Sequence, residues 1–106
     1  MNASSMNATP LCLQVTLQLR PGCEEQAAAC LEQLAAASRR EPGCLVYNAH
    51  RSLETPGRLL IYEIYRDQAA LEAHRASSHF ARYASGELYT LVESRAAELY
   101  GPIALA

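Results

Sequence analysis

Apolar and polar side chains alternate without a break from Leu11 to Arg20. The leucines and Val15 at the odd positions share one face, while mostly polar residues share the other. This period of two predicts a β-strand that buries one face. Pro21-Gly22 ends the pattern and indicates a turn.

A helical pattern follows over residues 23–40 and stops before Pro42-Gly43. Its apolar stripe has helical spacing, with glutamates in the first turn and arginines in the last, which suits the helix dipole. The stripe comprises Ala27, Leu31, Leu34, Ala35 and Ser38. The many alanines favour a helix that packs closely against a sheet.

Residues 44–53 and 58–66 are rich in apolar and β-branched side chains, and a turn at residues 54–57 separates them. We expect these two segments to be strands of an antiparallel hairpin. Asp67 then suits the N-cap of a short helix over residues 67–76, with Leu71 and His74 on its inner side. A second helical pattern covers residues 80–92, weakened at Gly86, and residues 96–103 are expected to form the last strand.

This β-α-β-β-α-β order predicts a ferredoxin-like α+β fold, in which a four-stranded antiparallel sheet carries helices on one face. The middle strands are nevertheless apolar on both faces. Leu59 and Ile61 oppose Leu60, Tyr62 and Ile64, and in the preceding strand Cys44 and Val46 oppose Leu45, Tyr47 and Ala49. Each buried Leu or Ile stabilises by about 1.5–3 kcal/mol. The pattern therefore predicts a homodimer that covers the open face.

Length and charge narrow the class of protein. The 106 residues suit one domain over residues 10–106, after a polar lead at residues 1–9 that we expect to be disordered. The net charge is -2, and no basic run exceeds Arg39-Arg40, which is atypical of nucleic-acid binding. The sequence contains neither a membrane-span pattern nor the apolar core of a signal peptide. We expect a soluble, cytoplasmic protein.

The four cysteines, at positions 12, 23, 30 and 44, form no Cys-x-x-Cys pair and have no histidine at a metal-site spacing. We expect free, buried or half-buried thiols. The sequence predicts neither a metal site nor a cofactor motif.

Three short motifs occur in order: Glu41-Pro42-Gly43-Cys44-x-x-Tyr47, Tyr62-Glu63-x-Tyr65-x-Asp67-x-x-Ala70-Leu71-x-x-His74, and Ser78-His79-Phe80. Together they resemble the antibiotic biosynthesis monooxygenase (ABM) domain family, over about residues 10–103. The resemblance implies a dimeric α/β barrel with a pocket between sheet and helices in each subunit. It also implies quinol-monooxygenase-like chemistry that uses O2 with neither metal nor flavin.

Other branches of the superfamily give alternatives. Haem-degrading relatives carry an Asn, a Trp and a His where this chain has Val15, His74 and Ala84, so that activity is not expected. A branch that isomerises a phosphorylated dione of the autoinducer-2 type shares the stretch from Ile61 to Asp67 and the histidine spacing. A small dicarbonyl isomerase is therefore the main alternative, and a non-catalytic dimer that binds a small ligand is the third hypothesis.

Cofactor-free oxidation of a phenol requires a base and an apolar pocket. We predict His74, Tyr65 and His79 as catalytic candidates, since a histidine titrates near neutral pH. The predicted pocket residues are Asn48, Tyr47, Glu63, Tyr83 and Phe80.

Simpler interpretations remain open for several of these residues. His74 could pack at the helix–sheet seam, His79 could cap the pocket, and Tyr47 and Tyr83 could be core residues. Glu63 could form an ion pair with an arginine across the dimer interface. His50 could face either side of its strand. Arg51 and Arg75 could bind an anionic substrate or be solvated.

Overall fold

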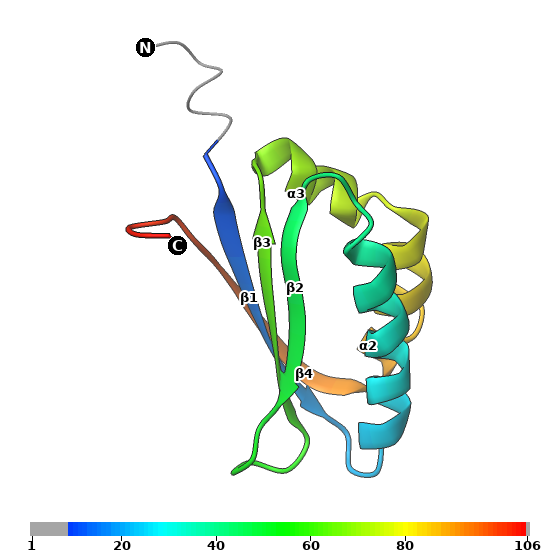
Figure 1. The fold of residues 1–106 in the computed structure, drawn as a ribbon. Coiled ribbons are helices and arrows are strands. Elements are labelled where there is room, and N and C mark those ends of the chain that lie inside the picture. Colours follow the sequence, from blue (N-terminus) through cyan, green and yellow to red (C-terminus); the bar gives the residue numbers. More distant parts are fainter. Residues whose placement is uncertain (1–8, 106) are drawn as a thin grey trace.

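The computed structural model describes residues 9–105, which form one antiparallel sheet covered by helices on a single face (Figure 1). Residues 1–8 of the polar lead, for which the sequence predicts disorder, lie outside the described residues, as does Ala106. The elements in chain order are β1 (Leu11–Leu19), α2 (Glu24–Ser38), β2 (Cys44–Arg51), β3 (Arg58–Tyr65), α3 (Gln68–Arg75), the π-helix η1 (Phe80–Ser85), the 3-10 helix η2 (Leu88–Leu91) and β4 (Val92–Tyr100). The strand order β2-β3-β1-β4 confirms the predicted ferredoxin-like α+β fold.

Local chemistry sets several element boundaries. Gly22, with φ of +83°, makes the turn between β1 and α2. The Asp67 side chain accepts a hydrogen bond from the Ala70 backbone N–H at 2.8 Å, as expected of the N-cap of α3. The first three predicted strands and both predicted α-helices agree with the structure to within two residues at each end.

The C-terminal third differs from the sequence prediction. The continuous helical pattern over residues 80–92 is two short helices, separated at Gly86 and Glu87. The last strand begins at Val92 rather than at residue 96 and ends at Tyr100. Arg20 N–H bonds to Leu91 O at 2.9 Å, and Val92 is in register with Leu19. Pairing with β1 therefore ends the helical segment earlier than the apolar period indicates.

A bulge in β2 corrects the predicted grouping of its side chains. The register with β3 shifts between Cys44 and Val46, so Cys44 lies opposite Tyr65 while Tyr47 lies opposite Glu63. Tyr47 is buried, whereas Leu45 is 56% exposed and does not share its face. An extra residue at a bulge reverses the alternation on one side of it.

The two faces of the sheet differ in burial. The odd-numbered residues of β1 and β3 face the helices and are mostly buried. On the open face, Leu60 is 37% exposed, and Tyr62 and Ile64 are half-buried. All four cysteines are free thiols, with Cys30 buried and the others intermediate. None of the helices within residues 9–105 has the length and apolar character needed to cross a membrane.

Candidate functional site

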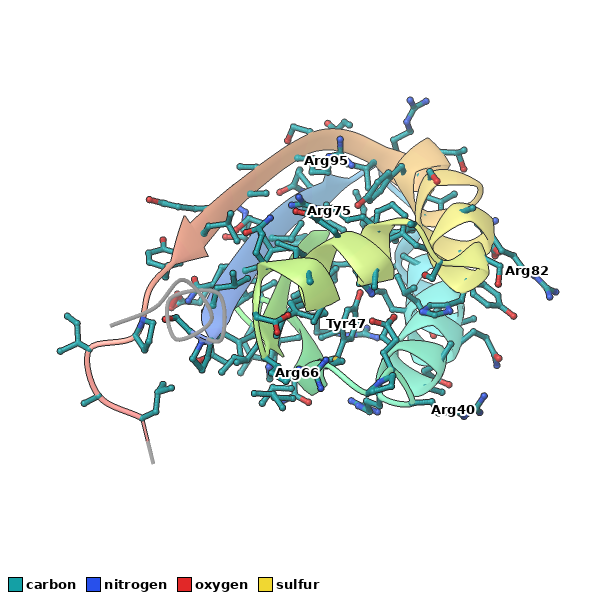
Figure 2. The ribbon with its side chains drawn as sticks, turned by 90° about the horizontal axis from the view of Figure 1, so that it is seen from above. Arg40, Tyr47, Arg66, Arg75, Arg82 and Arg95 are labelled. Carbon is teal, nitrogen blue, oxygen red and sulfur yellow. The ribbon has the colours of Figure 1, made fainter. Side chains whose placement is uncertain are left out.

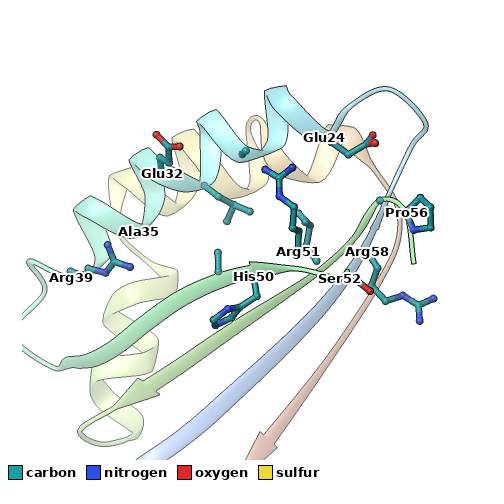
Figure 3. Close-up of a pocket in the computed structure, with 14 residues that line it drawn as sticks. Glu24, Glu32, Ala35, Arg39, His50, Arg51, Ser52, Pro56 and Arg58 are labelled. Carbon is teal, nitrogen blue, oxygen red and sulfur yellow. The ribbon is translucent and has the colours of Figure 1, made fainter. Parts of the chain in front are cut away.

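Two cavities of similar volume lie against the helices. The first, here called the α2 groove, has a volume of about 470 Å³ and runs between α2 and the β2–β3 hairpin (Figure 3). The second, here called the inner cavity, has a volume of about 490 Å³ and lies between the sheet, α3 and the two short helices. Its lining comprises Leu13, Val15, Leu34, Tyr47, Ile61, Glu63, His74, Arg75, Phe80, Ala84, Ser85, Leu88, Tyr89, Arg95 and Ala97.

Burial of ionisable groups distinguishes the inner cavity from the groove. Glu63 is 3% exposed and His74 is 2% exposed, and both line the inner cavity. The groove is instead lined by exposed charged residues such as Glu32, Arg51 and Arg58. Buried ionisable groups with perturbed pKa values are typical of functional sites. The inner cavity is therefore the candidate active site.

One carboxylate connects two histidines at the edge of the inner cavity. His74 lies on the buried side of α3, and its Nδ1 is 2.8 Å from Glu41 Oε2. His79, at the N-cap of η1, places its Nε2 2.5 Å from the same oxygen. A carboxylate that accepts at Nδ1 assigns the ring proton of neutral His74 to Nδ1 and leaves a lone pair on Nε2.

Glu63 approaches the opposite nitrogen of His74. Glu63 Oε1 accepts a hydrogen bond from the Tyr65 hydroxyl at 2.5 Å. The same oxygen is 3.7 Å from His74 Nε2, which is too long for a hydrogen bond. Burial raises the pKa of Glu63 to about 7, although the Tyr65 hydroxyl and the nearby charge of Arg75 oppose that shift.

Burial also disfavours the charged forms of the neighbouring groups. It lowers the pKa of His74, while Glu41 acts in the opposite direction. It raises the pKa values of the Tyr47 and Tyr65 hydroxyls, and the carboxylate of Glu63 adds to both shifts. Near neutral pH the inner cavity thus holds a neutral imidazole beside a carboxyl group close to its titration midpoint.

Aromatic rings enclose the imidazole of His74. Its centroid lies 5.2 Å from that of Tyr65, 5.3 Å from that of Phe80 and 5.8 Å from that of Tyr47. Tyr89 contacts Phe80 edge-on, with 6.2 Å between the ring centroids. Together with the aliphatic side chains of the sheet, these rings give a largely apolar wall that suits a planar aromatic ligand.

Glu41, His74 and His79 also offer a set of metal donors, since one ligand atom from each lies within 4.8 Å of the others. Their present contacts of 2.8 and 2.5 Å are hydrogen-bond distances. Two ligands of one tetrahedral zinc ion are about 3.3 Å apart at bond lengths of 2.0–2.1 Å. A divalent ion would therefore require the donors to separate, and the arrangement fits a hydrogen-bonded cluster directly.

The structure brings most of the predicted site residues together. Tyr47, Glu63, His74 and Phe80 line the inner cavity. Tyr65 is fully buried behind the cavity lining, where it bonds to Glu63 and packs against the ring of His74. His79 is connected to it through Glu41.

Asn48 and Tyr83 are not at the cavity. Asn48 is exposed and lies opposite Tyr62, which places it on the open face of the sheet. Tyr83 packs outside the cavity, where its backbone carbonyl accepts a hydrogen bond from the Cys30 thiol. Glu63 faces the helices rather than the open face, so it is not placed for an ion pair between two sheets.

Sequence reasoning missed Glu41, Tyr89 and Arg95 as site residues. Glu41 stands in the first quoted motif, directly before Pro42-Gly43, and that position was its only signal. Tyr89 lies in the predicted helical segment, which the structure divides into two short helices, and Arg95 lies before the predicted start of the last strand. Their approach to the cavity depends on the early start of β4.

The chain thus forms a small ferredoxin-like domain with a cavity between sheet and helices. The family model described as "Antibiotic biosynthesis monooxygenase" matches residues 10–86. The chain belongs to this family. It is also 32% identical over 84 residues to the Mycobacterium tuberculosis protein named "Putative monooxygenase Rv0793", an alignment that covers 77% of this chain and 82% of that protein.

Solved structures agree with this assignment. The structure of Rv0793 superposes with a TM-score of 0.84 at 27% identity, covering 92% of this chain and 99% of the other. The crystal structure of PA3566 from Pseudomonas aeruginosa gives a TM-score of 0.83 at 34% identity, covering 92% and 98% of the two chains. The family model and the name of the M. tuberculosis relative support a generic monooxygenase-like function.

Proposed function

We propose that the protein is a cofactor-independent monooxygenase that oxidises a quinol or a related aromatic phenol with O2 in the inner cavity. Family membership supports the reaction class. The observation that carries the proposal is His74, a buried imidazole whose Nδ1 is held by Glu41 and whose Nε2 faces the cavity beside Glu63.

The reaction balances without an external reductant. A hydroquinone that loses its phenolic proton becomes an anion that can transfer an electron to O2. One oxygen atom then forms a C–O bond on the ring, giving a hydroxyquinone, and the other atom leaves as water. An apolar cavity that excludes bulk water protects the radical and peroxide intermediates.

His74 Nε2 is the proposed base. When it takes the phenolic proton, the imidazolium is stabilised by the Glu41 carboxylate at 2.8 Å, as in other histidine–carboxylate pairs. Glu63, with a pKa raised by burial to about 7, can share this proton at neutral pH.

A route to solvent passes through Glu41. The shared oxygen Oε2 bonds to His79, whose side chain is 21% exposed, whereas His74 is closed off from water. Glu41 therefore connects the buried base His74 to the accessible imidazole of His79, which can exchange protons with solvent. The Tyr65 hydroxyl donates a hydrogen bond to Glu63 and holds its carboxyl group in position.

We also propose that the protein works as a homodimer through the open sheet face. Leu60, Tyr62 and Ile64 lie together on this face, which no helix covers (Figure 1). Sedimentation analysis at micromolar concentration should give a dimer, and Leu60→Glu should shift it to monomer. Leu53→Glu, at a 98% exposed position in the hairpin turn, is the matched control. A wild-type monomer would contradict the proposal.

The test of function is oxygen uptake by metal-stripped protein with a panel of hydroquinones and naphthoquinols, corrected for autoxidation. Saturable uptake is expected, and His74→Asn should reduce kcat by about 10²–10⁴-fold, as loss of a general base does. Glu32→Gln, at an exposed position of the α2 groove, should leave kcat unchanged. Uptake that His74→Asn leaves intact would refute the assigned base.

A dicarbonyl isomerase is the second candidate, because His74 and Glu63 place two proton carriers in one cavity. Isomerisation requires proton transfer and consumes no oxygen. Exchange of solvent deuterium into a small dione, without oxygen uptake on any quinol, would favour the isomerase. Binding of aromatic ligands with neither reaction would favour a ligand-binding protein.

A further inference from the structure

Two arginines, Arg75 and Arg95, line the inner cavity from different elements. Arg75 ends α3 and Arg95 lies in β4. Among residues 9–105, neither guanidinium has a carboxylate within 4.0 Å, whereas Arg51 and Arg66 both form ion pairs. Figure 2 shows Arg75 and Arg95 on the same side of the molecule, near β1 and β4, while Arg40, Arg66 and Arg82 lie at its periphery.

Neighbouring groups place both charges at the cavity. The guanidinium carbon of Arg95 lies 4.1 Å from the ring centroid of Tyr89, which also lines the cavity. This stacking leaves the N–H groups at the ring edge free to bind an anion. Arg75 directly follows His74. Burial raises the pKa of Glu63 and the charge of Arg75 opposes that rise, so the field of Arg75 reaches the cavity interior.

Sheet register gives the separation between the two ends of the cavity. Glu63 pairs with Leu13 of β1, while Arg95 pairs with Leu17, so the two residues lie two strands and four positions apart. With strands about 4.8 Å apart and a rise of about 3.3 Å per residue, their Cα atoms are about 16 Å apart. The register therefore places Arg95 toward the opposite end of the cavity from Glu63.

We propose that the ligand of the inner cavity is an aromatic molecule with an anionic group, a carboxylate or a phosphate, bound by Arg75 and Arg95. The apolar rings fill the space between the sheet and Phe80, and the hydroxyl-bearing end reaches His74. The assignment of the hydroxyl end rests on the proposed function. The anion site rests on the cavity and its two arginines.

Binding is the first test, since it requires no turnover. Calorimetry with naphthalene-2-carboxylate and with the neutral naphthalene-2-methanol should give about tenfold or greater preference for the anion, the range of a charge-assisted hydrogen bond. Arg75→Gln and Arg95→Gln should each abolish this preference. Arg82→Gln, which removes a guanidinium stacked on Tyr83 outside the cavity, should retain it. A third titration, with 2-naphthyl phosphate, compares the affinity of the site for phosphate with its affinity for carboxylate.

Equal affinity for the anionic and neutral ligands, or a preference that survives in both arginine variants, would overturn the inference. Oxygen uptake separates this outcome from failure of the proposed function. Anion-selective binding without uptake on any anionic naphthoquinol supports the site and rejects the oxygenase. Uptake with equal KM for anionic and neutral naphthoquinols rejects the site and supports the oxygenase.

Discussion

The α2 groove and the inner cavity have nearly equal volumes, about 470 and 490 Å³, but opposite chemistry. The groove is lined by alanines and by charged side chains that water solvates. The inner cavity encloses Glu63 and His74, which are almost completely buried. A hollow of sufficient size forms wherever a helix crosses a sheet edge. The burial of these two ionisable side chains costs free energy unless their polar atoms are paired.

Hydrogen bonds partly offset the free-energy cost of burying Glu63 and His74 in the inner cavity. Tyr65 donates to Glu63, and Glu41 binds both His74 and His79. Even so, Glu41 Oε1 is buried with no hydrogen-bond partner among residues 9–105. An unsatisfied buried acceptor destabilises the fold, and such groups occur where they serve another role, such as catalysis. This contrast makes the two cavities a matched pair for testing, because similar substitutions should have unequal effects.

The largest difference is expected for glutamates. Glu41→Gln replaces an acceptor by an amide that can donate to His74 Nδ1, which would move the ring proton to Nε2 and remove the proposed base. We expect kcat for oxygen uptake to fall by about 10²–10⁴-fold, by analogy with the carboxylate of a catalytic triad. Glu32→Gln, in the α2 groove, should leave kcat within about twofold. Comparable losses in both variants would remove the distinction.

The sequence predicts those parts of the site that depend on local patterns better than those that depend on contacts between distant residues. The alternation of β1 and the cap at Asp67 are local, and the structure confirms both. Parity along β3 places Glu63 on the same face as Leu59 and Ile61, toward the helices. That parity already argued against an interface ion pair for Glu63.

Other features depend on contacts that a period does not encode. Glu41 reaches His74 across 33 positions in the chain. Asn48 was predicted at the cavity together with Tyr47, although neighbouring residues of a strand point to opposite faces of the sheet. The early start of β4 follows from its pairing with β1, which overrides the helical period and brings Arg95 to the cavity.

The next largest effect concerns stability and pH. The pKa of Glu63 rises from 4.5 to about 7 on folding, so below pH 4.5 both states are protonated and the penalty is absent. As pH rises from 4.5 through 7, the unfolded state loses its proton first and the native state is destabilised, by about 3 kcal/mol in total. Glu63→Gln lacks this penalty, so its stability relative to wild type should increase over this range.

The lowered pKa of His74 has the opposite sign, since the unfolded state gains a proton as pH falls below 6.5 while the native state resists it. Wild-type stability alone therefore combines two opposed slopes. Urea denaturation of wild type and Glu63→Gln at each pH isolates the Glu63 contribution as a difference. A difference that stays constant between pH 4.5 and 7.5 would contradict the raised pKa.

A smaller effect is expected at the glycine that connects Glu41 to β2. A methyl group at Gly43 would lie 2.3 Å from Cβ of Ala70 in α3, the helix that carries His74. Gly43→Ala should therefore destabilise the fold by about 1–3 kcal/mol, as overpacking does, and shift α3 relative to Glu41. Denaturation midpoints measure the loss. Gly101→Ala, with no atom within 4 Å of the added methyl, is the control and should change stability little.

The smallest effect is expected for the ion pair in the groove. Arg51 Nη1 lies 3.7 Å from Glu25 Oε1, and the two side chains are 57% and 91% exposed. Solvent screening and side-chain entropy leave such a pair less than about 0.5 kcal/mol, so Arg51→Gln should unfold at nearly the wild-type urea concentration. A loss above about 1 kcal/mol would contradict the view that solvent screens this pair.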